Sequence, residues 1–131
     1  MPATLSMIEI IGGERDFVEQ LTDSLNTSGA KVVSGSENAS TLNILRLDYD
    51  SQVSKTDASG HATGYNYTYI LDYSVTNAAG DTLQQPTSLN QTRSQEYDPS
   101  QELQAEEERE FLKEEMEKEL IVQVLRRLSR L

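Results

Sequence analysis

Apolar and polar residues alternate most regularly in residues 65–77. Tyrosine, leucine and valine take one set of alternate positions there, and polar residues take the other, with Ile70 as the exception. Because side chains of a β-strand point alternately to the two faces of its sheet, the pattern predicts a strand with one covered and one solvated face. The covered positions are Tyr65, Tyr67, Tyr69, Leu71, Tyr73 and Val75.

Further extended segments precede and follow this strand. We predict short strands over residues 5–11 and 31–33, and longer strands over residues 41–54 and 82–97. Pro86 favours an edge position for the last strand, since proline cannot donate to the ladder. Polar segments with glycine join the three long strands, which indicates an antiparallel meander.

Helical periodicity predicts two helices. Phe17, Val18, Leu21 and Leu25 recur at helical spacing within residues 14–28. A second helix begins after Asp98, an N-cap residue followed by proline, and continues to the end of the chain. Its roughly 32 residues would span about 48 Å, longer than the ~36 Å diameter of a compact chain of this size, so it must brace a long sheet or overhang it.

The elements combine into a single domain over residues 1–131. They predict an α+β fold in which both helices pack on one face of a mixed, mostly antiparallel sheet. Residues 1–4 are interpreted as a leader remnant. In the last helix we expect the carboxyl half to pack, because the large apolar residues are concentrated there, and the amino half to be solvated.

Charge and composition exclude several classes of function. The chain has 22 acidic and 11 basic residues, a net charge of −11, and no cysteine. Disulfide, thiol and cysteine-ligated metal chemistry are therefore ruled out, and electrostatic capture of nucleic acid or anionic lipid is disfavoured. No apolar run has the ~20 residues of a membrane span, so we expect a soluble chain.

Catalytic residues are scarce. His61 is the only histidine, and no carboxylate is marked to orient it in a catalytic triad. Asp48, Asp50 and Asp72 lie on neighbouring predicted strands, either as a carboxylate site or, as we favour, as ordinary solvated strand residues. Gly12 is the start of a turn, because the acidic residues that follow would repel a phosphate. We expect no enzyme activity, no metal and no cofactor.

Two features leave two interpretations open. The alternating tyrosines either pack beneath the helices or present large, rigid contact area to a partner. The acidic run at residues 106–110 is either a solvated helix face, which we favour, or an acidic docking surface.

The element order and several short runs together resemble a known family, the LptE (RlpB) lipopolysaccharide (LPS)-assembly lipoproteins. The runs are Ile44-Leu45-Arg46-Leu47, Tyr65-Asn66-Tyr67-Thr68-Tyr69, Tyr97-Asp98-Pro99, Glu115-Met116 and Leu125-Arg126-Arg127-Leu128. The resemblance covers residues 5–131 and implies two helices on a four-stranded sheet. It also implies a lipoprotein of the gram-negative outer membrane, on its periplasmic face, that plugs the LptD barrel, helps it mature and binds LPS.

The chain departs from the family pattern in two places. A lipidated cysteine should precede the first strand, so we expect membrane association through an anchor upstream of Thr4. At the hairpin tip the basic residues are only Lys55 and His61, which become the candidate LPS-binding residues, and the start of the last helix is acidic. Barrel plugging is therefore the stronger expectation and direct LPS binding the weaker one.

Candidate barrel contacts are the tyrosines of the alternating strand: Tyr65, Tyr67, Tyr69 and Tyr73. The alternative function is a separate periplasmic module that binds glycan or lipid, which would have a preformed pocket and no obligate barrel partner. In both cases the function is binding, without chemistry.

Overall fold

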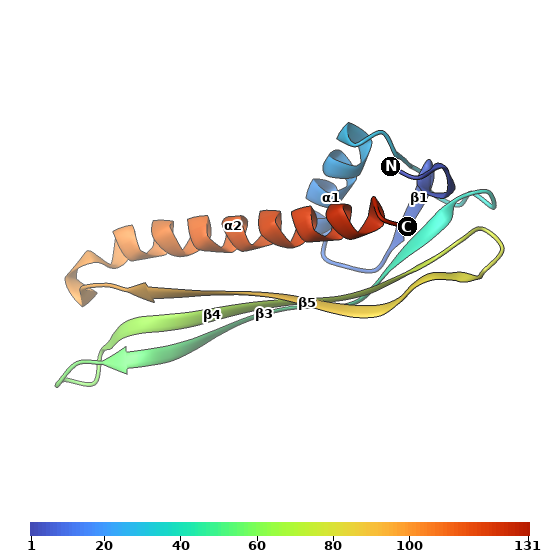
Figure 1. Ribbon diagram of the computed structural model, residues 1–131. Coiled ribbons are helices and arrows are strands. Elements are labelled where there is room, and N and C mark those ends of the chain that lie inside the picture. The colour runs from blue at the N-terminus through green and yellow to red at the C-terminus, as the bar shows by residue number, and fades with distance from the viewer.

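Five strands and two α-helices form two layers, with both helices on one face of the sheet (Figure 1). The computed structural model describes residues 1–131. The strands are β1 (Met7–Ile11), β2 (Lys31–Val32), β3 (Ser40–Thr56), β4 (Ala62–Thr76) and β5 (Thr82–Glu96), and the helices are α1 (Arg15–Thr27) and α2 (Glu102–Leu128). The predicted α+β class is confirmed.

The sheet order is β2-β1-β3-β4-β5. β1 pairs in parallel with β2 and with β3, whereas β3, β4 and β5 are antiparallel. The sheet thus has five strands, so the count of four implied by the family resemblance is wrong, whereas the short strand predicted over residues 31–33 is present as the edge strand β2. That strand exists because α1 returns the chain beside β1, where Lys31 N donates to Ser6 O at 2.7 Å and Val33 N to Ile8 O at 2.9 Å.

A β-bulge changes which residues of β3 face the helices. Ile44 pairs with Tyr73 and Arg46 with Asp72, so Leu45 between them has no partner across the ladder and is 55% exposed. Such an extra residue shifts the alternation by one position. Leu42 faces the helices before the bulge, and odd-numbered residues such as Leu47 face them after it.

Helix α2 begins four residues after Asp98. The Asp98 side chain accepts a hydrogen bond from Ser100 N at 3.0 Å and caps a 3-10 turn, Pro99–Gln101, from which α2 continues. Its 27 residues span about 40 Å and lie along β4 and β5 (Figure 1). As expected, the carboxyl half packs, whereas Leu103 and Phe111 near the amino end are 71% and 61% exposed.

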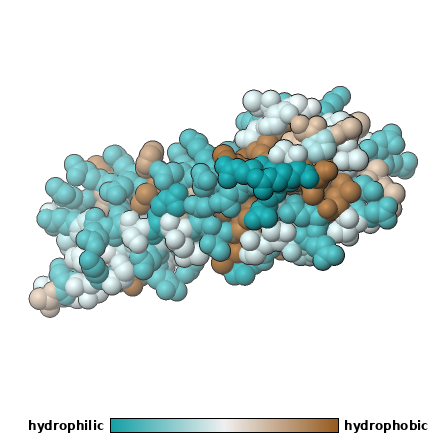
Figure 2. All heavy atoms as spheres, in the orientation of Figure 1, coloured by the Kyte–Doolittle hydropathy of each residue, from teal (hydrophilic) through white to brown (hydrophobic).

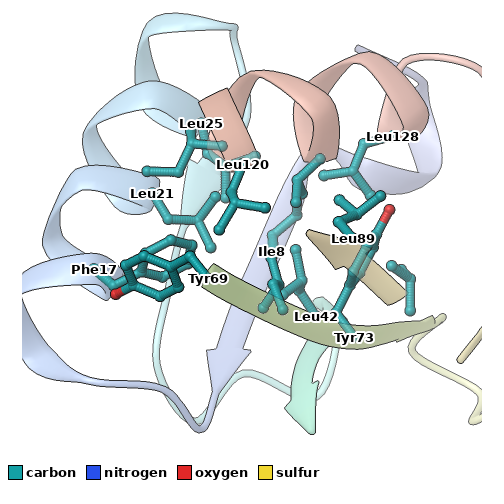
Figure 3. Packing of buried hydrophobic residues seen from close by; sticks show 14 of the residues in the cluster. Ile8, Phe17, Leu21, Leu25, Leu42, Tyr69, Tyr73, Leu89, Leu120 and Leu128 are labelled. Carbon is teal, nitrogen blue, oxygen red and sulfur yellow. The ribbon is translucent and has the colours of Figure 1, made fainter. Parts of the chain in front are cut away.

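The core fills the space between the helices and one face of the sheet (Figure 3). Phe17, Leu21 and Leu25 of α1 meet Leu120 of α2 over Tyr69 of β4. Further along the sheet the core continues through Ile8, Leu42, Tyr73, Leu89 and Leu128. The tyrosines are therefore structural elements of the core, in agreement with the packing interpretation.

Glu117 is the only charged residue that the fold buries, with 7% of its surface exposed. Its Oε2 lies 3.5 Å from the Tyr69 hydroxyl, which donates a weak hydrogen bond to it. Burial raises the pKa of the Glu117 carboxyl, and the nearby acids Glu14 and Asp16 add to the rise, whereas Lys113 and the Tyr69 hydrogen bond oppose it. Folding therefore makes protonation of Glu117 easier than it is in the unfolded chain.

Replacing Tyr69 by alanine is expected to lower the free energy of unfolding by about 3–5 kcal/mol, because a fully packed aromatic ring leaves a cavity. Urea unfolding of the isolated chain measures the change. Phe111→Ala is the matched control, since Phe111 is 61% exposed and its truncation should cost less than about 0.5 kcal/mol. Equal losses for the two variants would contradict the core assignment of Tyr69.

Glu117→Gln is expected to stabilise the protein at pH 7.5 and to change it little near pH 4. A carboxyl with a raised pKa in the folded state binds more protons there than in the unfolded state, so stability falls as pH rises from the unfolded pKa through the folded pKa. Glutamine does not titrate, so the variant does not lose this stability as the pH rises.

Urea unfolding of wild type and Glu117→Gln at a series of pH values between 4 and 8 measures this difference. Glu107→Gln, on the exposed side of α2, is the control and should follow the wild-type curve. A gap between Glu117→Gln and wild type that stays constant over the series would contradict the buried-carboxyl explanation.

Candidate functional site

Both predicted LPS-binding residues lie at the β3–β4 hairpin tip, and each has an acidic partner. Lys55 Nζ forms an ion pair with Glu96 of β5, and both side chains are largely exposed. His61 Nδ1 lies 3.5 Å from Asp57 Oδ2. Hydrogen bonds from the backbone of His61 and then of Ser59 lower the pKa of Asp57 and hold the turn closed.

A hydrogen-bonded network ties α2 to the sheet between the tip and the core. The Tyr67 hydroxyl donates to Gln95 Oε1 at 2.6 Å and accepts from Arg109 Nε at 3.0 Å. Gln95 Nε2 in turn donates to the carbonyl of Ala105 in α2 at 2.9 Å. The Arg109 guanidinium also lies 5.3 Å above the centre of the Tyr65 ring. These contacts fix the solvated half of α2 in place.

The four candidate barrel-contact tyrosines differ in exposure. Tyr67, Tyr69 and Tyr73 are at most 1% exposed and face the helices. Tyr65 is half-buried and stacks on Tyr97, with ring centres 5.9 Å apart and planes 3° apart. Only Tyr65 therefore has surface at which a partner can touch it.

The face of the sheet opposite the helices is uncovered (Figure 1). Along β4 and β5 the register sets a strip of uncharged polar residues on this face, in which Asn66 pairs with Ser94 and Thr68 with Thr92. Ser94 Oγ donates to Asn66 Oδ1 at 2.8 Å, and Asn90 lies beside Ile70. The strip is notable in a chain with 25% charged residues.

Charges on this face gather on β3. Asp48 and Asp50 share a shallow hollow of about 270 Å³ with Arg46, whose Nη2 lies 3.2 Å from Asp48 Oδ2. Asp72 of β4 lies opposite Arg46 of β3 in the strand register. No group of three or more histidine, cysteine or acidic residues is arranged to hold a metal ion.

A second hollow, of about 450 Å³, lies between the two helices. It is lined by Gln20, Asp23, Ser24, Lys118, Ile121, Val122 and Leu125. Hydrophobic atoms come to the surface where α1 and α2 meet (Figure 2). The hollow is open to solvent.

Gly12 has the role of a turn, as predicted. Its φ is +89°, and a Cβ added there would lie 2.5 Å from the Ile44 carbonyl oxygen. Glycine is therefore required by the close approach of β1 and β3.

Sequence reasoning missed Gln95, Arg109 and Glu117. Arg109 carried a signal, since it is the only basic residue in the acidic run of residues 106–110. Glu117 lies next to Met116 and four residues before Ile121, both buried, so its position on the helix already pointed inward. No sequence signal marked Gln95, because the strand around it is polar throughout. Neither helix has the length of apolar sequence that crossing a bilayer requires.

Comparison with solved structures finds lipoproteins of similar fold. A minor lipoprotein from Acinetobacter baumannii has a TM-score of 0.79 at 18% identity, over 98% of this chain and 94% of its own. Lipoprotein B from Nitrosomonas europaea gives 0.80 at 22% identity, over 98% and 88%. Rare lipoprotein B from Shewanella oneidensis gives 0.78 at 16% identity, over 95% and 94%.

Comparison of sequences gives the family. No curated protein matches the chain at a significant level. A family model described as "LptE: Lipopolysaccharide-assembly" matches residues 3–128, nearly the whole chain. The resemblance inferred from the sequence is thus confirmed, and the chain belongs to the LptE family of lipopolysaccharide-assembly proteins.

Proposed function

We propose that the chain is a non-enzymatic subunit of the outer-membrane LPS translocon, which occupies the lumen of the LptD barrel and assists its assembly. A lipid anchor upstream of Thr4 would hold it at the periplasmic face of the membrane. Membership of the LptE family supports this role, and the similar solved structures are described as lipoproteins.

The uncovered polar face of the sheet is the observation that carries the proposal. Strands of an outer-membrane barrel alternate apolar residues toward lipid with polar residues toward the lumen. A plug therefore needs a surface that exchanges hydrogen bonds with polar side chains. The strip on β4 and β5 supplies uncharged hydroxyl and amide groups, whose desolvation opposes docking less than that of the charged residues beside it, Asp72 of β4 and those of β3. Its residues are Asn66, Thr68, Ser88, Asn90, Thr92 and Ser94.

A plug acts by occupancy. It binds only the folded barrel and therefore stabilises that state by mass action. It also fixes the shape of the lumen that LPS meets, without making or breaking a bond. The extended sheet, backed by α2, provides a surface long enough for this task (Figure 1).

The tyrosines contribute in two ways. Tyr67, Tyr69 and Tyr73 lie in the core and hold the sheet against the helices, so their effect on the barrel acts through the fold. Tyr65 remains the candidate for direct contact, because its ring and that of Tyr97 reach the surface near the tip. The alternative glycan- or lipid-binding module needs an enclosed pocket, and the hollows described above are open.

LPS contact at the tip is a second proposed role, favoured by the exposed Lys55–Glu96 pair. Surface ion pairs contribute only about 0–1 kcal/mol, so Lys55 can exchange its carboxylate partner for a phosphate at small cost. His61 lies on the adjoining turn and supplies further hydrogen-bonding capacity.

Thr92→Arg is expected to lower the yield of co-purified barrel by about tenfold or more, because a desolvated, unpaired charge on the docking strip costs over 1.4 kcal/mol. Tagged variants pulled down from outer membranes, with the barrel identified by mass, measure this. The control is Thr27→Arg on the exposed end of α1. Both isolated variants should keep the wild-type thermal midpoint. Equal barrel yields from the two variants would exclude the strip as the docking surface.

Lys55→Asp is expected to weaken LPS capture by about tenfold at low ionic strength, since a charge-assisted contact contributes roughly 1.5–3 kcal/mol. Glu96→Gln should strengthen capture, because it releases Lys55 from its partner. Titration of the purified chain with LPS at two ionic strengths measures both effects. Lys31→Asp, with the same charge change away from the tip, is the control. If Lys55→Asp and Lys31→Asp bind LPS equally, the tip is not the LPS site.

A further inference from the structure

We propose that Arg126, Arg127 and Arg130 form a phosphate-binding site that seats the carboxyl end of α2 on anionic phospholipid headgroups. The inference rests on the proposed function in one respect, the lipid anchor that places the domain at a membrane. The site is separate from the hairpin tip and from the uncovered sheet face.

Arg126 and Arg127 share one flank of α2 with Gln123, and Arg130 lies in the turn that follows the helix. Positions 123, 126, 127 and 130 are spaced three, four and seven residues apart and so fall on one side of a helix, over about 10 Å. The four side chains line a hollow of about 290 Å³ that no other residue enters. The hollow is polar and positively charged, which suits an anion.

None of the three guanidinium groups has an acidic partner. Five of the other basic residues form ion pairs within the chain, namely Arg15, Arg46, Lys55, Arg93 and Arg109. No acidic residue lies between Glu119 and the end of α2 at Leu128, so no side-chain carboxylate on this stretch of α2 neutralises the cluster. Like charges four residues apart, as in Arg126 and Arg130, repel each other in a helix. The helix dipole offsets part of this repulsion, and a bound anion would offset the rest.

Guanidinium groups favour phosphate in particular. Each presents a planar fork of N–H donors that can bind two phosphate oxygens at once. Three such groups over two helical turns can therefore hold a phosphate ester, and the extended hollow favours headgroups in a row over one compact ion.

The location points to a membrane surface as the source of the phosphates. Both chain ends lie at the same end of the molecule, beside α1 and β1, and the β3–β4 tip is at the opposite end (Figure 1). An anchor joined to the amino end would bring the carboxyl end of α2 to the lipid headgroups. Residues 102–119 of α2 carry nine of the 22 acidic residues, and an anionic leaflet would repel them. The charge distribution along α2 thus orients the domain with its tip away from the membrane.

The test measures binding of the full chain to phosphatidylcholine vesicles with and without 30% phosphatidylglycerol, by sedimentation at low ionic strength. Wild type is expected to bind only the anionic vesicles. The triple variant Arg126→Gln, Arg127→Gln, Arg130→Gln should bind about 100-fold more weakly, since one basic residue near an anionic surface accounts for about fivefold. The control triple variant Arg15→Gln, Arg46→Gln, Lys118→Gln has the same net charge and should bind as wild type does.

Inorganic phosphate provides a second arm. In ¹⁵N NMR spectra the Nε–H signals of the three arginines should shift when phosphate is added, and phosphate should compete with the vesicles if the phosphate group itself is recognised. Signals that move with vesicles alone would assign the site to the lipid surface. The single variants Arg126→Gln and Arg130→Gln, both at exposed positions, repeat the test if the triple variant unfolds.

Two results would overturn the inference. One is vesicle binding that falls equally in the arginine variant and the charge-matched control, which would indicate a general charge effect. The other is wild type that responds neither to anionic vesicles nor to phosphate. The barrel pull-down separates the two proposals, because a wild-type chain that pulls down the barrel but binds neither anionic vesicles nor phosphate would overturn the lipid site alone.

Discussion

The packing of α2 onto the tyrosine face of β4 is the constraint on which the rest of the structure depends. The three long strands of the sheet, with 15 to 17 residues each, form two large faces, and two helices cover only one of them. The long polar side chains of Tyr67, Gln95 and Arg109 satisfy one another where α2 no longer has apolar residues to bury. Without this network, few contacts would hold the amino half of α2 against the sheet.

Because the helices cover one face of the sheet, the opposite face is the one available to bind partners. The helix side is closed by core packing, and the opposite side presents hydroxyl and amide groups along β4 and β5. On this face charge is concentrated on β3, and on the other side of the molecule it lies on α2, as acids on its amino part and arginines at its end. The uncovered face therefore sets an uncharged hydrogen-bonding strip on β4 and β5 beside a charged one on β3, although the sequence is acidic on average.

Much of the fold could be predicted from the sequence because its strongest patterns are local. The alternation around Tyr69 and the helical spacing of Phe17, Leu21 and Leu25 are set by residues close in the chain, and the structure confirms both. The count of four strands implied by the resemblance was wrong, although the short strand over residues 31–33 was itself predicted and is β2. The bulge at Leu45 and the partners of Gln95 and Glu117 were not accessible, because each depends on which distant residue lies opposite. His61 lies in the loop, as predicted, whereas Lys55 lies in β3, which is longer than predicted, and the acidic partners of both come from register and turn geometry that the sequence does not show.

The contacts of Arg109 also have a mechanical consequence. A helix resting on a sheet resembles a beam made of two layers, and such a beam is stiff only if its layers do not slide past each other. Apolar contacts resist separation but permit sliding, since they have no preferred direction. The directional bonds from Arg109 to Tyr67 and from Gln95 to the Ala105 carbonyl act as pins against shear near one end, while the core locks the other. A load applied at the hairpin tip is then transmitted along the whole molecule to the end that carries the chain termini, instead of being absorbed by local bending (Figure 1).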